Sequence, residues 1–168
     1  MIFRLACVND LSSIKTMYEE IIENMNQNNI CIWNEYYPFE CFEGDINSQR
    51  LYVLEENDSI VAACALCDSN EAEKNMKWKN EEARALYIDR LGVNVNYQGK
   101  GYGSLVIKNV IEIARKNQFE YLRLFVVDIN NPAICLYEKN RFEKLNGVYE
   151  EKINEKVTLK EYAYEMKI

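Results

Sequence analysis

Three glycines lie within five residues near the middle of the chain, in the sequence Gln98-Gly99-Lys100-Gly101-Tyr102-Gly103. The segment 85–95 before this loop is apolar and typical of a strand. The segment 104–116 after the loop has the apolar spacing of an amphipathic helix, with Leu105, Ile107, Val110, Ile111 and Ala114. A strand, a glycine loop and a helix in this order favour an α/β fold.

The remaining periodicities predict an α/β domain with a mixed sheet, as a single domain over residues 1–168. Further strands are expected at 3–6, 51–54, 60–66, 121–127, 148–153 and 158–167, and further helices at 10–22 and 131–140. Asp10 and Asn131 are the expected helix N-caps, and Asn57-Asp58 is the expected turn between two antiparallel strands. The aromatic-rich segment 25–48 is expected to be irregular, with room for an optional second helix before the strand at 51–54.

The sequence contains no histidine. This excludes Ser-His-Asp and Cys-His catalysis and His-ligated zinc, and it leaves acid–base work to carboxylates, tyrosine, cysteine, lysine or bound water. The chain has 20 Lys and Arg against 27 Asp and Glu, a net charge of −7. Because general nucleic-acid binding needs a basic face, this balance argues against a nucleic-acid partner.

Six cysteines raise the question of compartment. Cys64 and Cys67 have C-x-x-C spacing, but they lie in the strand-like run 59–67, where residues three apart face opposite sides. We therefore expect reduced thiols in a cytoplasmic protein, rather than a zinc, redox or disulfide site, and no metal. The first residues lack a signal-peptide pattern and no run of about 20 apolar residues occurs, so no membrane association is expected.

The glycine loop suits a phosphate-type anion. Glycine allows positive φ angles and close approach to the backbone amides, and the start of the following helix adds unpaired N–H donors and a positive dipole end. A tight turn without a ligand is the alternative. The spacing differs both from the P-loop pattern and from the G-x-G-x-x-G dinucleotide fingerprint.

Two segments resemble the motifs of a known family. Residues 91–103 look like the acetyl-CoA-binding motif of the GNAT superfamily of N-acetyltransferases, in which Gln98, Gly101 and Gly103 take the specified positions. Residues 130–142 resemble a second motif of that family, with matches at Asn130, Ala133, Tyr137 and Phe142 and with Arg141 in place of the usual glycine. Weaker similarity at Trp33, Tyr37-Pro38, Asp45-Ile46 and 87–91 points to a bacterial branch whose acceptors are mostly unassigned.

The resemblance implies a single-domain GNAT-like fold. Its central sheet would be mixed and mostly antiparallel, flanked by helices, with a V-shaped splay between strands 4 and 5. Acetyl-CoA would be the co-substrate, with no metal. The cofactor-binding residues implied in this way are Leu91, Gly92, Val93, Gln98, Gly99, Lys100, Gly101, Tyr102, Gly103, Ser104, Asn130 and Tyr137.

The implied reaction transfers an acetyl group to a primary amine of a small molecule or peptide by direct attack, without an acyl-enzyme. The amine must lose a proton, the oxyanion must be stabilised and the leaving thiolate must be protonated. The resemblance points to a main-chain N–H near Val93 as the oxyanion donor. Tyr137 is the candidate acid, or else it packs against the cofactor or the core. Asp89 is the candidate base by strand parity with Leu91 and Val93, or else it pairs with Arg90.

The acceptor side is expected to include Trp33, Tyr36, Tyr37 and Asp89, although the aromatic segment would serve equally well as core beneath a long loop. Residues 98–123 carry a net charge of +3, whereas residues 1–60 carry three basic and eleven acidic side chains, a net charge of −8. This contrast suits an anionic cofactor and a cationic amine, unless these charges are simply solvated surface. The terminal strands offer edges for a homodimer.

Two other functions fit the same residues. One is a non-catalytic acyl-CoA-binding sensor or regulatory module on the same fold, which would bind acetyl-CoA without turnover. The other is a purely structural α/β protein without affinity for CoA.

Overall fold

The computed structural model describes residues 1–153 and 158–168, and these form two compact units. The first unit comprises Met1–Leu66 and Asp89–Asn109, and the second comprises Cys67–Ile88 and Val110–Ile168. The strands are hydrogen-bonded in the order β1-β2-β3-β4-β5-β8-β6, and β7 pairs with β8. Strand β4 (Ala85–Val93) and helix α3 (Tyr102–Lys116) each contribute residues to both units.

The first unit contains an antiparallel sheet portion made by β1 (Ile2–Leu5), β2 (Leu51–Glu56) and β3 (Ser59–Cys67). Asn57 and Asp58 have φ angles of 49° and 59°, which gives the tight hairpin turn expected at this dipeptide. Helix α1 (Leu11–Gln27) buries Ile14, Met17, Tyr18 and Ile21. The stripe of apolar residues at helical spacing therefore forms the core face of this unit, as its periodicity predicts.

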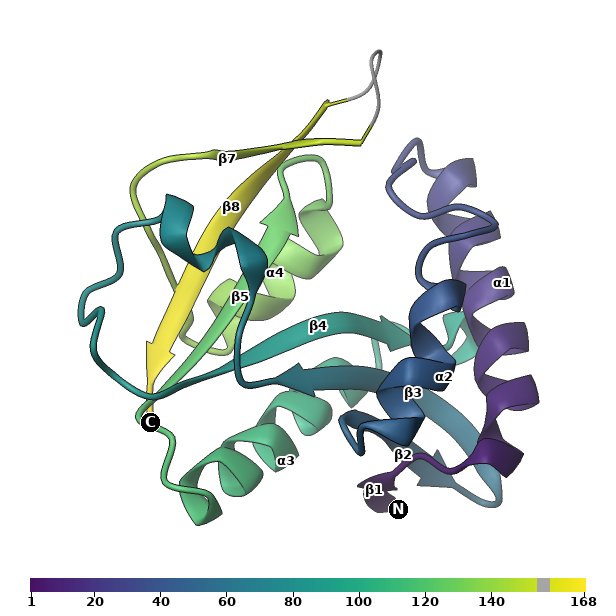
Figure 1. Ribbon diagram of the computed structural model, residues 1–168. Helices are drawn as coiled ribbons and strands as arrows, with labels where there is room; N and C mark the ends of the chain where they lie inside the picture. The colour runs from purple at the N-terminus through teal and green to yellow at the C-terminus, as the bar shows by residue number, and fades with distance from the viewer. Residues whose placement is uncertain (154–157) are drawn as a thin grey trace. The chain divides into compact units, whose positions relative to one another are not determined.

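The segment 25–48 is more regular than expected, because it contains helix α2 (Phe39–Asn47). This helix lies beside α1 (Figure 1) and buries Phe42, Asp45 and Ile46. The Phe42 ring lies 4.8 Å from that of Tyr18 on α1. The apolar stripe of α2 is short and is interrupted by Asp45, so the helical spacing of apolar residues in the sequence is too weak to define this helix.

The second unit is built around β5 (Tyr121–Val127) and β8 (Thr158–Lys167), which pair antiparallel along the whole of β5. The start of β4 pairs with β5 in parallel, from Ala85↔Tyr121 to Tyr87↔Arg123. Strands β6 (Glu143–Lys144) and β7 (Tyr149–Lys152) both pair antiparallel with β8. The prediction of a mixed, mostly antiparallel sheet flanked by helices is confirmed, and the V-shaped splay between β4 and β5 stays a prediction.

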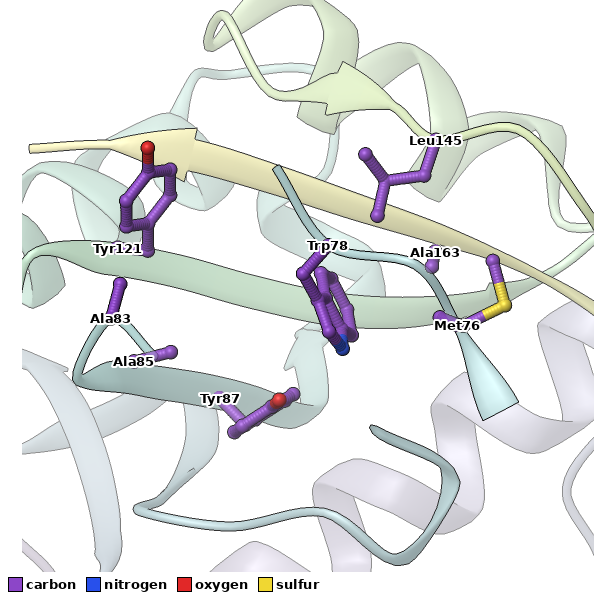
Figure 2. Packing of buried hydrophobic residues seen from close by; sticks show 8 residues of the cluster. All are labelled: Met76, Trp78, Ala83, Ala85, Tyr87, Tyr121, Leu145 and Ala163. Carbon is purple, nitrogen blue, oxygen red and sulfur yellow. The ribbon is translucent and has the colours of Figure 1, made fainter. Parts of the chain in front are cut away.

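The core of the second unit contains the segment that precedes β4 (Figure 2). Trp78 is almost fully buried, and its ring lies edge-on to Tyr87 at 6.0 Å and to Phe125 at 5.8 Å. The buried set consists of Met76, Trp78, Ala83, Ala85, Tyr87, Tyr121, Leu145 and Ala163. The polar stretch 68–82 is thus anchored by the large apolar side chain within it.

Three short 3-10 helices complete the description, at Val8–Asp10, Glu71–Asn75 and Val95–Tyr97. Within the residues that the structure describes, no helix combines the length and the hydropathy needed to cross a bilayer.

Of the two expected helix caps, Asp10 has the predicted position and Asn131 is wrong. Helix α4 (Asn131–Lys139) is capped by Asn130 rather than Asn131, because the Asn130 side chain accepts the Ala133 amide at 3.4 Å. Asp10 precedes α1 as expected, but its carboxylate does not cap that helix. It instead accepts the Cys7 amide at 2.7 Å and pairs with Arg4 at 2.7 Å, since a guanidinium lies within reach.

Arg141, which stands where the resembled motif usually has glycine, has a left-handed backbone conformation. Its φ angle is +67°, and it ends α4 in a Schellman turn in which the Arg141 amide donates to Glu138 O and the Phe142 amide donates to Tyr137 O. The departure from the family pattern therefore keeps the turn and adds backbone strain.

Arg141→Gly is therefore expected to stabilise the protein by about 1 kcal/mol, because glycine enters the left-handed region without the clash of a Cβ. For a chain of this length the melting temperature would rise by about 2–4 °C. Arg141→Ala is the matched control, since it removes the same side chain but retains the Cβ, and it should bring no gain. A melting temperature that is equal or lower in the glycine variant would contradict the strain argument.

Candidate functional site

The loop between β4 and α3 has the backbone geometry that its glycines predict. Gly99 has a φ angle of +72° and Gly101 one of +89°, which residues with a side chain rarely adopt. A Cβ placed on either residue would contact nothing within 4 Å. Glycine is therefore needed at these two positions because of the positive φ angles of the loop, and not because a side chain would clash with neighbouring atoms.

The amides of this loop are available to a ligand. Among the described residues, the amides of 99–103 donate no backbone hydrogen bond, and α3 begins at Tyr102. These donors, together with the positive end of a helix of 15 residues, form an arrangement that suits an anion of the phosphate type. Ser104, the last residue of the predicted set in this region, lies half-buried in the first turn of α3.

Several of the predicted side chains hold the loop in place. The Gln98 amide donates to the carbonyl of Val93 at 3.2 Å, and the Tyr102 hydroxyl donates to Glu56 at 2.6 Å. The hydrogen bond with Glu56 also raises the pKa of Tyr102. The Lys100 ammonium donates to the Asn96 carbonyl at 2.8 Å. Gln98 and Tyr102 thus link the loop to the strands of the first unit.

The end of β4 departs from a regular strand. Arg90 has a φ angle of +50°, which places a left-handed residue between Asp89 and Leu91. Asp89 was grouped with Leu91 and Val93 because alternate residues of an extended strand face the same side. The left-handed residue at 90 interrupts that alternation, so strand parity no longer supports Asp89, which stays a prediction. Gly92 is buried, and a Cβ there would lie 2.9 Å from Tyr18 Cζ.

A buried ion pair beside Asp89 was missed by reasoning from sequence. Asp45 on α2 is fully buried and accepts Arg90 Nη2 at 2.8 Å and Arg50 Nε at 2.6 Å. The Asp89 carboxylate lies farther from the Arg90 guanidinium, at 4.0 Å. Asp45 shares the apolar stripe of α2 with Phe42 and Ile46, and a carboxylate on such a stripe is itself a signal of a paired buried charge.

The predicted acceptor residues have different environments. Trp33 is half-buried with its ring 5.5 Å from Tyr18, whereas Tyr36 is 68% exposed. Burial raises the pKa of Tyr37 to about 12, against the opposing effect of the nearby Arg90, so this phenol stays protonated at neutral pH. The aromatic segment thus divides: Phe42 lies in the core, Tyr36 lies at the surface, and Tyr37 is 37% exposed although its phenol is surrounded by protein.

The cysteines carry no arrangement for nucleophilic attack or metal binding. Burial raises the pKa of Cys41, the cysteine near Arg90, so its thiol stays neutral. All six cysteines are free thiols, and Cys135 is exposed whereas Tyr137, two residues along α4, is buried. In the part of the chain that the structure describes, no group of three or more His, Cys, Asp or Glu side chains is placed to hold a metal ion.

Asn130 and Tyr137 belong to the second unit. Asn130 caps α4 with its side chain, as described above. Tyr137 is 6% exposed, and its ring lies 5.7 Å from Phe142 and 6.5 Å from Tyr164. The second family motif therefore forms a compact helix end with an aromatic cluster.

Residues 15–142 match the model of the acetyltransferase (GNAT) family. The chain belongs to this family. Thialysine N-epsilon-acetyltransferase of Bos taurus is 39% identical over 61 residues, which cover 36% of this chain and 34% of that protein. The GNAT chain thus spans about a third of the length of this curated relative.

Two solved bacterial structures cover nearly all of this GNAT chain. A Staphylococcus aureus Mu50 protein, provisionally identified as an acetyltransferase, has a TM-score of 0.75 at 29% identity and covers 99% of both chains. A GNAT-family acetyltransferase from Streptococcus agalactiae 2603 has a TM-score of 0.85 at 18% identity, covering 99% of this chain and 95% of that one. Both likenesses agree with the predicted GNAT fold.

Proposed function

We propose that this chain transfers an acetyl group from acetyl-CoA to a primary amine of a small molecule or peptide, by direct attack and without an acyl-enzyme. The observation that carries this proposal is the loop 99–103, where left-handed glycines and free amides precede the start of α3. Acetyl-CoA carries phosphate groups that suit such donors and supplies the activated acetyl group. The proposed domain spans residues 1–168, in a cytoplasmic protein that acts without a metal, a membrane or nucleic acid.

The residues proposed to hold acetyl-CoA act mainly through their backbone. The amides of 99–103 would bind the phosphates, with Ser104 beside them and with Gln98 and Tyr102 keeping the loop rigid through their hydrogen bonds. Leu91, Gly92 and Val93 would line the thioester end, where a main-chain N–H stabilises the oxyanion; removal of such a donor costs about 3 kcal/mol. Asn130 and Tyr137 remain in the proposed cofactor set.

Proton transfer is proposed to involve Tyr137 as the acid and Asp89 as the base, directly or through water. A phenol with an ordinary pKa of about 10 matches a thiolate leaving group of about 8.5. Without histidine in the chain, a carboxylate is the best alternative for the amine proton. Direct attack is supported by the position of Cys135, which is exposed whereas Tyr137, two residues along α4, is buried, so the two side chains lie on different faces of the helix.

The proposed acceptor is a cationic amine that meets Trp33, Tyr36, Tyr37 and Asp89. The acidic first 60 residues support this, although Asp10, Glu55 and Asp45 are already paired with arginines. The bovine relative is named for transfer to an ε-nitrogen, which also supports an amine as acceptor. A homodimer through the edges of the terminal strands stays part of the proposal.

The test is release of CoA thiol from acetyl-CoA across a panel of polyamines, aminoglycosides, amino acids and N-terminal peptides. We expect turnover with at least one cationic amine, and a loss of about 100-fold in kcat for Tyr137→Phe with binding of acetyl-CoA retained. Binding without turnover by any amine would favour the acyl-CoA sensor instead. The absence of any acetyl-CoA affinity would contradict both functions.

A further inference from the structure

Strand β4 carries a strained residue beside the proposed base. Arg90 has a φ angle of +50°, although it has a Cβ and a long side chain and lies between two strand residues. The left-handed region is unfavourable for such a residue, and it persists only where the surroundings hold it. Two neighbouring side chains hold Arg90 in this conformation, one through its backbone and one through its side chain.

The backbone of Arg90 is held by Tyr18. The Tyr18 hydroxyl donates to the Arg90 carbonyl at 2.5 Å and lies 3.3 Å from the Ala63 carbonyl on β3. Tyr18 is fully buried, and its ring reaches β4 because Gly92 leaves the necessary space. A Cβ on Gly92 would come within 3.0 Å of the Tyr18 hydroxyl.

The side chain of Arg90 is held by Asp45. Both Nε and Nη2 of Arg90 donate to Asp45 Oδ2, at 3.1 Å and 2.8 Å. The Asp45 side chain is fully buried and the Arg90 side chain is 10% exposed, so the pair lies largely out of water. The other oxygen of Asp45 accepts Arg50 Nε at 2.6 Å, so Oδ2 alone serves Arg90.

We propose that Tyr18 and Asp45 are positioning residues for the acetyl transfer. By holding Arg90 in its left-handed conformation, they set the direction of the Asp89 side chain and of the main-chain amides at 91–93. This inference rests on the proposed function. A change of Arg90 to extended backbone would rotate the peptide groups on both sides of it. A displacement of about 1 Å at a reacting group lowers the rate by about 100-fold.

The first test compares Arg90→Ala with Arg90→Gly. Both variants lose the guanidinium, but only glycine accepts the left-handed conformation without strain. We expect kcat to fall about 100-fold in the alanine variant and about tenfold or less in the glycine variant. The KM for acetyl-CoA should stay within twofold of wild type in both. Equal losses would show that the guanidinium acts directly, and losses below twofold would show that the kink is not needed; either result overturns the proposal.

The second test separates an effect on positioning from an effect on stability. It compares a variant of Asp45 with a variant of Arg50, the other arginine that this carboxylate binds. Asp45→Asn weakens the hold on Arg90, whereas Arg50→Ala weakens the same buried carboxylate without touching β4. Both variants should melt at a lower temperature than wild type, because each leaves a buried charge with fewer partners. We expect kcat to fall about tenfold in Asp45→Asn and to stay within twofold in Arg50→Ala. Similar values of kcat in the two variants would overturn the proposal.

The third test needs no turnover. Tyr18→Phe keeps the buried ring and removes the hydroxyl that holds the Arg90 carbonyl. Hydrogen exchange at the amides of 89–93 should become at least tenfold faster than in wild type, while exchange in β5 stays unchanged. Unchanged exchange at 89–93 would overturn the proposed hold on Arg90. An inactive wild type with the expected exchange would refute the proposed transferase function and leave this hold supported.

Discussion

Replacing Gly101 by glutamate is expected to abolish the stabilisation of the protein by acetyl-CoA. At a ligand concentration of 100 times Kd, binding adds about 2.7 kcal/mol to the free energy of unfolding, a rise of about 5–10 °C in the melting temperature for a chain of this length. Gly101 has a φ angle of +89° and lies among the free amides of the loop. A glutamate there would be strained and would place a negative charge where the phosphates are expected. Differential scanning fluorimetry with and without acetyl-CoA measures both melting temperatures.

Two further variants separate the causes of this loss. Gly44→Glu makes the same chemical change on α2, where no Cβ contact within 4 Å and no positive φ occurs, and it should retain the full rise. Gly101→Ala adds strain without charge, so its affinity for acetyl-CoA should fall by only about tenfold. A full rise in melting temperature for Gly101→Glu would contradict the assignment of this loop to the cofactor.

Glu165→Leu is expected to cause the largest loss of stability among simple substitutions in the second unit. Glu165 is 1% exposed, and its Oε2 lies 3.5 Å from Nε of Arg123, which is 3% exposed. Removing one partner leaves the other as an uncompensated buried charge, which costs about 3–5 kcal/mol. The melting temperature should therefore fall by about 10 °C or more. Thermal unfolding followed by circular dichroism measures the fall.

The double variant Arg123→Met/Glu165→Leu is the matched comparison. Arg123 Nε and Glu165 Oε2 have no hydrogen-bond partner among the residues that the structure describes, so the pair is incompletely satisfied. Replacement of both members by apolar side chains removes this defect and should recover most of the stability lost in the single variant. Arg123 also lies 4.3 Å over the Trp78 ring and donates to the Asn80 carbonyl at 2.6 Å. The melting temperatures of Arg123→Met and Glu165→Leu alone complete the comparison. If the double variant loses as much stability as the two single variants together, the other contacts of Arg123, rather than the ion pair, contribute most of the stability.

The local elements could be predicted because their signals lie within a few residues. β5 was expected at 121–127 and has these bounds, and the helix expected at 104–116 begins two residues earlier, at Tyr102. The hairpin at Asn57-Asp58 follows from two residues that tolerate the left-handed region. The bounds of helix α2 and the cap at Asn130 were not predicted, because a short mixed stripe and two neighbouring asparagines leave the choice to tertiary contacts.

In the candidate site, too, the local backbone could be predicted from the sequence and the long-range contacts could not. The spacing of Gly99 and Gly101 predicts the loop conformation, since the need for positive φ is a property of the residue itself. The partner of Arg90 was not predictable by spacing. Strand parity suggested Asp89 as a candidate base, but it could not show that Asp45 lies closer to Arg90 than Asp89 does.

The sequence by itself determined the α/β class, the left-handed glycine loop, the absence of histidine chemistry and the resemblance to the acetyltransferase family, because each depends on residue type and short-range order. Only the tertiary structure decided that β4 is kinked at Arg90 and which residues hold it there. Asp45 is 45 residues and Tyr18 is 72 residues from Arg90 in the chain. The Asp45 carboxylate and the Tyr18 hydroxyl reach Arg90 only because α1 and α2 pack against β4. The spacing of residues along the sequence does not encode this packing.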